Sequence, residues 1–307
     1  MIEIVLATYN GEHYIAEQLD SILQQSYQEF QILVRDDGST DNTVEILKSY
    51  IRRYPEKIRL FTSKERAGGP AQNFFQLMQS TTANYVMFSD QDDVWFPKKI
   101  EVMYKTMLQL EKENGKELPI LVFSDYRIVD EQLQDMDFDS RNNQIFAYRL
   151  DLNYLLVQNY VTGCTAMINK ELYQRVGLYD KAIQMHDWWV ALIASAMGVI
   201  YHLPQQLMLY RQHENNCVGA VNIKSFHYRI HKFLDKKTKL SQQKYVAQAK
   251  CFYERYEIYL GGKEKKILQD FIEIWKYKNK WKRMRMLLKG KYLKSDFVRI
   301  LGQLWYV

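Results

Sequence analysis

Residues 85–95 read Tyr-Val-Met-Phe-Ser-Asp-Gln-Asp-Asp-Val-Trp, a short apolar run that turns abruptly acidic. The apolar part is typical of a buried strand. Asp90, Asp92 and Asp93 then crowd together, and like charges this close repel unless a cation joins them. A hard divalent ion with oxygen ligands, shared with substrate phosphates, fits this arrangement. The alternative is a solvated acidic turn that caps a helix starting near Pro97–Lys99.

Strands and helices alternate around this stretch. Short apolar segments predict strands at 2–7, 30–35, 58–62, 85–89 and 120–124, and amphipathic segments predict helices at 14–25, 44–51, 70–78, 152–159, 171–176 and 188–197. The alternation predicts an α/β fold, a mixed and mostly parallel sheet with helices on both faces. Ligands bind such sheets beyond the carboxyl ends of the strands, so residues 8–11, 36–43 and 90–95 are the candidate loops.

The two other loops carry polar groups suited to a nucleotide. Asp36 and Asp37 end a predicted strand, where a carboxylate is well placed to accept hydrogen bonds from a ribose or a base edge. Thr8-Tyr9-Asn10-Gly11 follows the first strand and alone indicates only a turn with an aromatic residue. Together the loops would hold a nucleoside diphosphate, with Tyr9 against the base, Asp37 on the base or ribose, and the acidic stretch on a metal-bound pyrophosphate.

These three motifs, in this order and spacing, resemble those of family 2 glycosyltransferases with the GT-A fold, the Rossmann-like fold of nucleotide-diphospho-sugar transferases. The resemblance covers roughly residues 1–220. It implies inverting transfer from a nucleotide-sugar donor, with a divalent metal, Mg²⁺ or Mn²⁺, as cofactor. It assigns nucleotide binding to Thr8, Tyr9, Asn10, Asp37 and Asp90, and metal binding to Asp90 and Asp92, with Asp93 extending the metal motif.

Met185-His186-Asp187-Trp188-Trp189 resembles the later motif that carries the catalytic base of this family. The resemblance implies that Asp187 deprotonates the acceptor hydroxyl, since an inverting displacement needs a single base opposite the leaving group. Many relatives have Glu-Asp here, so His186 departs from the pattern, and we expect it to tune or orient the base. The alternative for Asp187 is a helix N-cap. Trp188 has two interpretations, stacking on a sugar ring or packing in the core.

Three further segments resemble parts of the sugar-binding region. In Tyr210-Arg211-Gln212-His213, the resemblance implies that Arg211 neutralises phosphate charge and that His213 completes the metal shell, the alternative being a structural histidine. Thr162-Gly163-Cys164-Thr165 resembles the small-residue stretch that lines the donor sugar, with Cys164 a buried small hydrophobe rather than a nucleophile. Ala67–Asn73 resembles the glycine-containing loop that approaches the donor and ends in an Asn, here Asn73.

The charge of the chain is unevenly distributed. The formal net charge of +6 divides into −9 for residues 1–223, with 20 Lys+Arg and 29 Asp+Glu, and +15 for residues 224–307, with 22 and 7. Apolar residues at helical spacing accompany the basic ones, a pattern typical of interfacial helices on anionic lipid. The alternative is packing on the catalytic domain or in a homodimer. Nucleic-acid binding is not expected, because no nucleic-acid motif accompanies the charge.

The first residues and the cysteines predict a cytoplasmic protein. Residues 1–7 lack the basic region and the long apolar run of a secretory signal peptide, and no stretch approaches the roughly 18 apolar residues of a membrane span. Cys164, Cys217 and Cys251 are odd in number and form no CxxC pair, which argues against a disulfide framework. We expect peripheral attachment to the inner face of the plasma membrane through residues 224–307.

The sequence therefore predicts a catalytic domain, 1–223, with a nucleotide-binding half at about 1–119 and an acceptor-binding half at about 120–223, followed by a basic amphipathic helical region, 224–307. Asp-Gln-Asp-Asp-Val-Trp, His-Asp-Trp-Trp and Tyr-Arg-Gln-His resemble the rhamnosyltransferase-like branch that builds bacterial surface polysaccharides. This implies dTDP-L-rhamnose as donor, with a UDP-hexose as the alternative, and a saccharide acceptor on a polyprenyl lipid. The rivals are a nucleotidyltransferase, whose glycine- and basic-rich phosphate loop residues 8–12 lack, and a non-catalytic nucleotide-sugar-binding protein.

Overall fold

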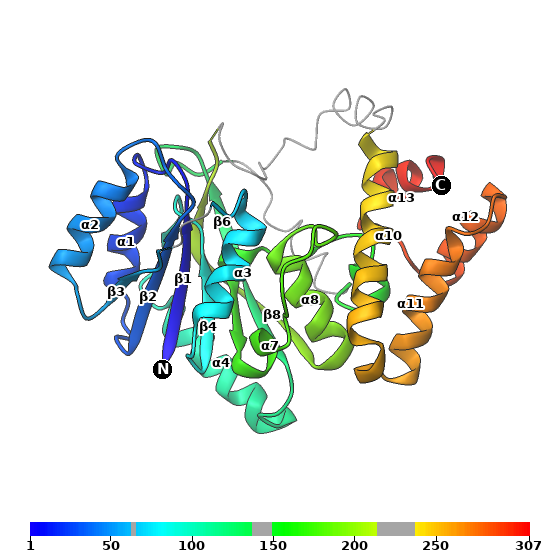
Figure 1. The fold of residues 1–307 in the computed structure, drawn as a ribbon, viewed down its shortest axis with the longest axis horizontal. Helices are drawn as coiled ribbons and strands as arrows, with labels where there is room; N and C mark the ends of the chain where they lie inside the picture. The colour runs from blue at the N-terminus through cyan, green and yellow to red at the C-terminus, as the bar shows by residue number, and fades with distance from the viewer. Residues whose placement is uncertain (63–65, 137–148, 214–236) are drawn as a thin grey trace.

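One mixed sheet organises the part of the chain that the computed structural model describes, residues 1–62, 66–136, 149–213 and 237–307. In these residues eight strands lie in the order β3-β2-β1-β4-β7-β6-β8-β5 (Figure 1). Their bounds are β1 Ile2–Thr8, β2 Phe30–Asp36, β3 Ile58–Leu60, β4 Tyr85–Ser89, β5 Val94–Trp95, β6 Ile120–Val129, β7 Ala166–Asn169 and β8 Val199–Arg211. The first four strands run parallel, as do β6 and β8, whereas β7 is antiparallel to both its neighbours and β5 is antiparallel to β8.

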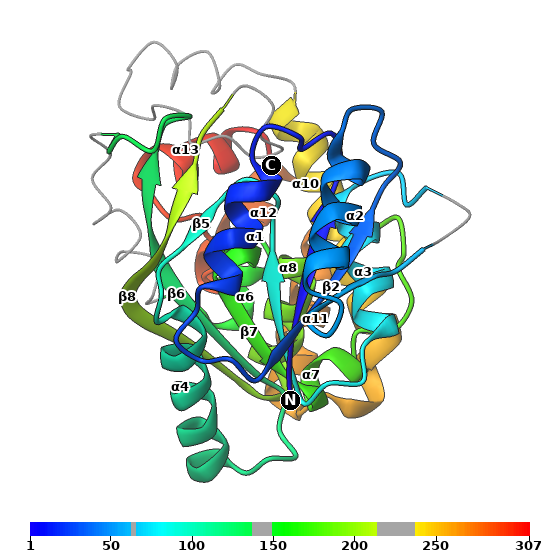
Figure 2. The same ribbon diagram turned by 90° about the vertical axis from the view of Figure 1, so that its left-hand side faces the viewer.

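Helices cover both faces of this sheet, which confirms the predicted fold class (Figure 2). Side chains alternate across β1, so that Ile4 and Leu6 join one core and Val5 joins the other. The first core contains residues of α1 Ile15–Leu23, α2 Thr43–Arg53 and α4 Lys99–Asn114. The second contains residues of α3 Pro70–Ser80, α6 Leu152–Leu155, α7 Lys170–Gln174 and α8 His186–Met197. The short helix η1 Gly163–Thr165 contributes Cys164 to the first core.

Several elements differ from the prediction. The helix expected at 152–159 ends at Leu155, and the strand expected at 120–124 continues to Val129. β7 and the long strand β8 were not predicted. β8 contains Pro204, and its pairing with β6 shifts register near Asp125, so its sequence lacks the regular alternation that identifies a strand.

The C-terminal helices contribute residues to the second core, and the first of them packs on α8 (Figure 1). They are α10 Lys237–Tyr256, the short η2 Glu257–Tyr259, α11 Gly262–Ile274, α12 Lys280–Lys289 and α13 Phe297–Trp305. The ring of Phe252 lies 5.3 Å from that of Trp189, and Arg255 donates to the carbonyl of Val176 at 3.1 Å. The packing alternative therefore holds for α10. The predicted domain boundary at 223 falls outside the described residues.

None of the helices in the described residues combines the length and the apolar character needed to cross a bilayer.

Candidate active site

The loops after β1, β2 and β4 meet at the carboxyl edge of the sheet. Thr8 donates its hydroxyl to Asp36 at 2.9 Å, and Asn10 accepts from the amide of Thr40 at 2.8 Å. Asn10 has a positive φ of 48°, in the left-handed region that Asn tolerates better than most residues. The backbone of Tyr9 exchanges two hydrogen bonds with the side chain of Gln91, at 2.8 and 3.0 Å, and its ring is half exposed. The local contacts thus hold all three predicted loops together.

Asp37 is buried and anchors the glycine-containing loop. Its carboxylate accepts hydrogen bonds from the backbone amides of Ala67, Gly68 and Gly69, the last two at 3.1 and 3.2 Å. The guanidinium of Arg35 joins it at 3.2 Å and also donates to Asn73 at 3.1 Å. Asn73 is therefore buried behind the loop and linked to Asp37 through Arg35.

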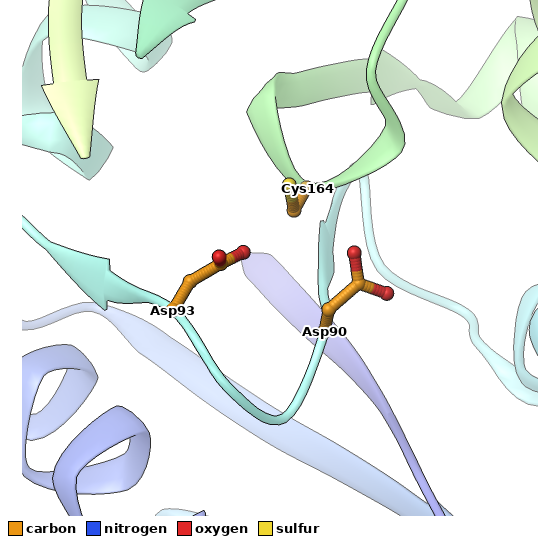
Figure 3. A group of neighbouring side chains, drawn as sticks. All are labelled: Asp90, Asp93 and Cys164. Atoms are coloured by element: carbon orange, nitrogen blue, oxygen red, sulfur yellow. The ribbon is translucent and has the colours of Figure 1, made fainter. Parts of the chain in front are cut away.

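Asp90, which is half-buried, forms an acidic cluster with the buried Asp93 and Cys164 (Figure 3). One ligand atom of each residue lies within 4.8 Å of the others. Burial and the neighbouring carboxylates raise the pKa of Asp90 to about 7 and raise that of Asp93 well above its usual value. Burial likewise raises the pKa of the Cys164 thiol. The thiol is thus protonated at neutral pH, in agreement with the expected small buried hydrophobe.

Lys99, at the start of α4, lies buried beneath this cluster. Its ammonium donates to the carbonyl of Cys164 at 2.6 Å and sits 3.7 Å from the ring centre of Trp95. Burial lowers the pKa of Lys99 to about 7, while the cluster carboxylates act in the opposite direction. This residue was not predicted as part of the site, because a lysine near a helix start is ordinarily solvated.

Asp92 has a partner of its own, His213. Its carboxylate meets Nε2 of His213 at 2.8 Å, and the His213 ring packs against Tyr14 at 4.8 Å between centroids. The structure thus gathers Asp90 and Asp93 with Cys164, and it brings Asp92 together with His213. The metal set expected from the sequence, Asp90–Asp92–His213, stays a prediction.

Arg211 is buried and fixes the acidic loop, defined as residues 90–93. Its Nε donates to the carbonyl of Asp92 at 2.8 Å, its backbone amide donates to Asp93 at 3.2 Å, and Glu17 pairs with its guanidinium. The guanidinium also lies 4.8 Å from the ring centre of Tyr14. These contacts bury the Arg211 side chain, and its expected role in neutralising phosphate charge stays a prediction.

The acidic loop suits a hard divalent cation. Carboxylate oxygens are the ligands that Mg²⁺ and Mn²⁺ favour, and a cation would relieve the repulsion that raises the pKa values of Asp90 and Asp93. The protonated thiol of Cys164 is a poor ligand for such an ion. Asp90 and Asp93 therefore fit the metal in this arrangement, and Asp92, which meets His213 through Oδ2, has a second carboxylate oxygen that could join them.

Asp187 lies in the first turn of α8 and faces the η1 turn. One carboxylate oxygen accepts from the amide of Trp188 at 2.6 Å, and the other accepts from the amide of Gly163 at 3.1 Å. Burial raises the pKa of Asp187 to about 7, against these hydrogen bonds, which lower it. The negative charge of Asp187 also raises the pKa of Asp90. The helix predicted at 188–197 begins at His186, and its N-cap is Met185. Asp187 therefore lies in the first turn of α8 and is not the N-cap.

His186 is buried beside Asp187. Its ring stacks on Phe74 at 3.9 Å between centroids, and neither ring nitrogen has a hydrogen-bond partner among the described residues. Burial lowers its pKa to about 3, so the imidazole is neutral. A Cβ on Gly163 would lie 2.6 Å from Nε2 of His186, which explains the glycine at that position. His186 thus shapes the site by packing and not by a hydrogen bond to the base.

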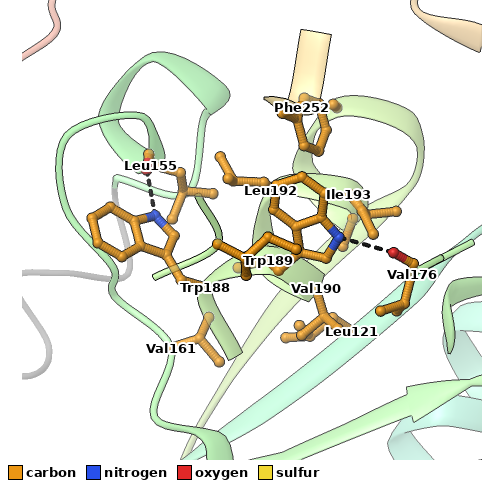
Figure 4. Packing of buried hydrophobic residues seen from close by; sticks show 14 of the residues in the cluster. Leu121, Leu155, Val161, Val176, Trp188, Trp189, Val190, Leu192, Ile193 and Phe252 are labelled. Carbon is orange, nitrogen blue, oxygen red and sulfur yellow. Dashed lines mark hydrogen bonds between the residues drawn. The ribbon is translucent and has the colours of Figure 1, made fainter. Parts of the chain in front are cut away.

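Trp188 lies in the core (Figure 4). Its indole nitrogen donates to the carbonyl of Leu155 at 2.6 Å, and its ring packs 5.3 Å from that of Tyr245. The neighbouring Trp189 is fully buried and donates to Val176 at 3.1 Å. Both indoles therefore serve packing, the second of the two interpretations.

The fold is that of a GT-A transferase, with the three candidate loops at the carboxyl edge of the sheet. The sequence profile of Glycosyl transferase family 2 matches residues 3–177, more than half of the chain, and the protein belongs to this family.

Curated relatives agree with this assignment. The chain is 30% identical over 238 residues to a dTDP-rhamnosyl transferase, RfbG, of Shigella flexneri, an alignment that covers 73% of this chain and 78% of that protein. It is 25% identical over 288 residues to an uncharacterized glycosyltransferase of Rickettsia typhi, covering 88% and 87% of the two chains.

Solved structures share the fold. Residues 1–349 of TarS from S. aureus, in complex with UDP-GlcNAc, superpose with a TM-score of 0.55 at 16% identity, covering 99% of this chain and 89% of that one. The mannosyltransferase PcManGT from Pyrobaculum calidifontis, in complex with GDP-Man and Mn²⁺, gives a TM-score of 0.54 at 16% identity, with 99% and 87% covered. At this identity the likeness establishes the GT-A fold and nothing further.

Proposed function

We propose that this glycosyltransferase moves a sugar from a nucleoside diphosphate donor to a saccharide hydroxyl, with inversion, and that Asp187 is the base. The observation that carries the proposal is the η1 turn, which has a different partner on each side. Gly163 donates its amide to Asp187 at 3.1 Å, and the next residue, Cys164, forms the cluster with Asp90 and Asp93. The candidate base and the candidate phosphate–metal groups are thus separated by one turn of chain.

The environment of Asp187 suits proton transfer. A base works best when its pKa lies near the working pH, and burial raises the pKa of Asp187 to about 7. The amides of Trp188 and Gly163 fix both carboxylate oxygens, so the side chain is held in one orientation. In the proposed step, Asp187 takes the proton of the acceptor hydroxyl as that oxygen attacks the anomeric carbon and the bond to the diphosphate breaks.

The donor would lie along the three loops. Tyr9 offers an exposed aromatic face for a base, and the Asp37-anchored loop at 67–69 presents backbone to the nucleotide. A divalent cation on Asp90 and Asp93 would supply positive charge to the departing diphosphate. Arg211 holds the Asp93 carboxylate and the backbone of Asp92, and Lys99, bonded to the carbonyl of Cys164, acts on Asp90 and Asp93 through its charge.

The similarity to the Shigella flexneri dTDP-rhamnosyl transferase, at 30% identity, supports dTDP-L-rhamnose as the donor. We further propose that the acceptor is a saccharide on a polyprenyl lipid, within surface-polysaccharide synthesis, and that the enzyme works at a membrane surface. The basic C-terminal helices support that location.

Transfer by the purified chain tests the proposal. dTDP-L-rhamnose and UDP-hexoses are supplied with Mn²⁺ or with EDTA, and NMR of the product reports the anomeric configuration. Asp187→Asn should lower kcat at least about a hundredfold yet leave nucleotide binding, measured by thermal shift, nearly unchanged. Asp151→Asn is the matched control, because Asp151 is an exposed carboxylate at the start of α6 that makes no capping hydrogen bond. Undiminished turnover of Asp187→Asn would remove it as the base, and stabilisation by UDP in place of dTDP would overturn the donor.

A further inference from the structure

The outer side of α12 and α13 combines positive charge with exposed apolar side chains. Residues 276–294 contain nine Lys and Arg and no Asp or Glu. Large apolar residues are exposed within and just after this segment. We define the basic–aromatic face by the following side chains: Trp281, Lys282, Arg285, Leu288 and Lys289 of α12, and Phe297, Leu301 and Trp305 of α13.

On α13 the apolar residues form one stripe. Phe297, Leu301 and Trp305 are spaced four apart, so they lie on the same side of the helix. Phe297 is 73% exposed and Trp305 is 60% exposed, although the opposite side of the helix buries Gly302 and Gln303. A helix that packs on the protein by one side and leaves large apolar residues on the other indicates a second contact surface.

On α12 the exposed apolar residues alternate with basic ones. Trp281 is 76% exposed, and Leu288 lies two turns further along the same helix. Arg285 and Lys289 are exposed between and beside them. The two helices are joined where Lys280 donates to the carbonyl of Trp305 at 2.6 Å and lies 5.3 Å from its ring centre. The start of α12 and the end of α13 thus contribute to one surface.

We infer that the basic–aromatic face docks on an anionic phospholipid bilayer. Trp and Phe side chains insert at the boundary between headgroups and acyl chains, while Lys and Arg beside them contact lipid phosphates. Indole rings favour this boundary because they are apolar with one polar edge. The inference deepens the proposed function by naming the surface and the partner, and it rests on the proposed lipid-linked acceptor.

Charge complementarity selects lipid over the other possible occupants. Two copies of the chain would bring Lys282, Arg285 and Lys289 of one face against the same three residues of the other, which opposes self-association through this face. Single-stranded nucleic acid would use the basic groups and the indoles for stacking, but Leu288 and Leu301 offer it nothing. A bilayer can contact both the basic and the apolar residues of the basic–aromatic face.

The docking would place the catalytic edge near the membrane. In both views of the fold, α13 lies toward the end of the molecule to which the carboxyl end of β1 points (Figure 1 and Figure 2). The loops after β1 and β4 carry the candidate site. An acceptor held in the bilayer would therefore meet the site from the docked side.

The full-length chain and vesicles of phosphatidylcholine, with or without phosphatidylglycerol, test the inference by co-sedimentation. We expect binding only to the anionic vesicles, weakening as salt is added. Arg285→Glu/Lys289→Glu should weaken binding at least about tenfold, and so should Trp281→Ser/Trp305→Ser. The matched controls are Lys112→Glu/Lys116→Glu, on the surface near the end of α4, and Ile258→Ser/Tyr259→Ser, which are 81% and 63% exposed at η2.

Tryptophan fluorescence supplies a second readout. Of the six tryptophans, Trp95, Trp188 and Trp189 are already buried and Trp275 is partly buried. A shift to shorter wavelength on anionic vesicles would therefore report chiefly on the two exposed indoles of the face. Equal binding by all variants, or equal binding to uncharged vesicles, would overturn the inference. The inference would also be overturned if the wild-type chain formed dimers, or complexes with a single-stranded oligonucleotide, and only the face variants lost them. Neither assay uses donor or acceptor, so their failure is separate from failure of sugar transfer, and donor hydrolysis in solution should be unchanged in the face variants.

Discussion

Asp187→Asn should stabilise the folded chain at alkaline pH while it abolishes sugar transfer. Burial raises the pKa of Asp187 from 3.8 to about 7 in the folded protein. A carboxyl group whose pKa is higher in the folded than in the unfolded state opposes folding as the pH rises between the two values. The wild-type chain should therefore lose stability through this group between about pH 4 and pH 7, and the variant should not.

The size of the effect follows from the pKa difference. About three pKa units at about 1.4 kcal/mol each give at most about 4 kcal/mol at pH 8, and partial exposure of Asp187 reduces this figure. Near pH 4 the wild-type carboxyl is protonated, and a protonated carboxyl and an amide have nearly the same shape and one carbonyl oxygen each. The two chains should thus be almost equally stable in acid and should diverge as the pH rises.

Urea denaturation in EDTA, across that pH range, measures the divergence. Asp90 adds to it with the same sign, because the charge of Asp187 raises the pKa of Asp90 and the variant removes that charge. Asp151→Asn again serves as the control, since its exposed carboxylate should leave the stability–pH curve unchanged. Parallel curves for the wild type and Asp187→Asn would refute the raised pKa and, with it, the argument for Asp187 as a base poised near neutral pH.

Three further predictions concern the same edge of the sheet. The kcat/KM for transfer should rise about tenfold per pH unit below pH 7 and level off above it, because only ionised Asp187 accepts a proton; a pH–rate profile measures this. Gly163→Ala should lower kcat at least about tenfold in steady-state kinetics, since the new Cβ would lie 2.6 Å from Nε2 of His186. Gly262→Ala should leave kcat unchanged, because the space around Gly262 is open. Lys99→Met should lower Tm by several degrees in thermal melts with EDTA, because it removes a buried positive charge beside the acidic loop. In the same melts, Mn²⁺ should raise Tm more for this variant than for the wild type.

The first half of the fold could be predicted from the sequence because its central strands, β1, β2 and β4, are buried on both faces. Segments such as Ile2–Thr8 and Tyr85–Ser89 are therefore continuous apolar runs with turn residues after them. The later strands lack that signal. β7 has four residues. β8 lies next to the two-residue edge strand β5, and Pro204 and Gln205 in its middle are exposed. Their position depends on pairing with β6, which no local pattern encodes.

The candidate site could likewise be predicted only in part. The motifs identified which loops converge, since the carboxyl ends of parallel strands share one edge. The motifs did not identify the partner of each carboxylate, because the partners lie far away in the sequence. His213 holds Asp92, and Lys99 and Cys164 surround the other two carboxylates. Tyr14, which packs on both His213 and Arg211, belongs to no motif and was not predicted.

The C-terminal helices cannot be regarded as a detachable anchor. Phe252 of α10 packs on Trp189, two residues after Asp187, and Phe271 of α11 belongs to the same core as Val5 of β1. Removing these helices would uncover α8 and admit water behind the candidate base, which would lower the raised pKa that burial produces. Truncation at the predicted boundary would therefore confuse loss of membrane contact with loss of the site. Substitutions on the outer basic–aromatic face separate the two, because the inner sides of the same helices keep the core closed.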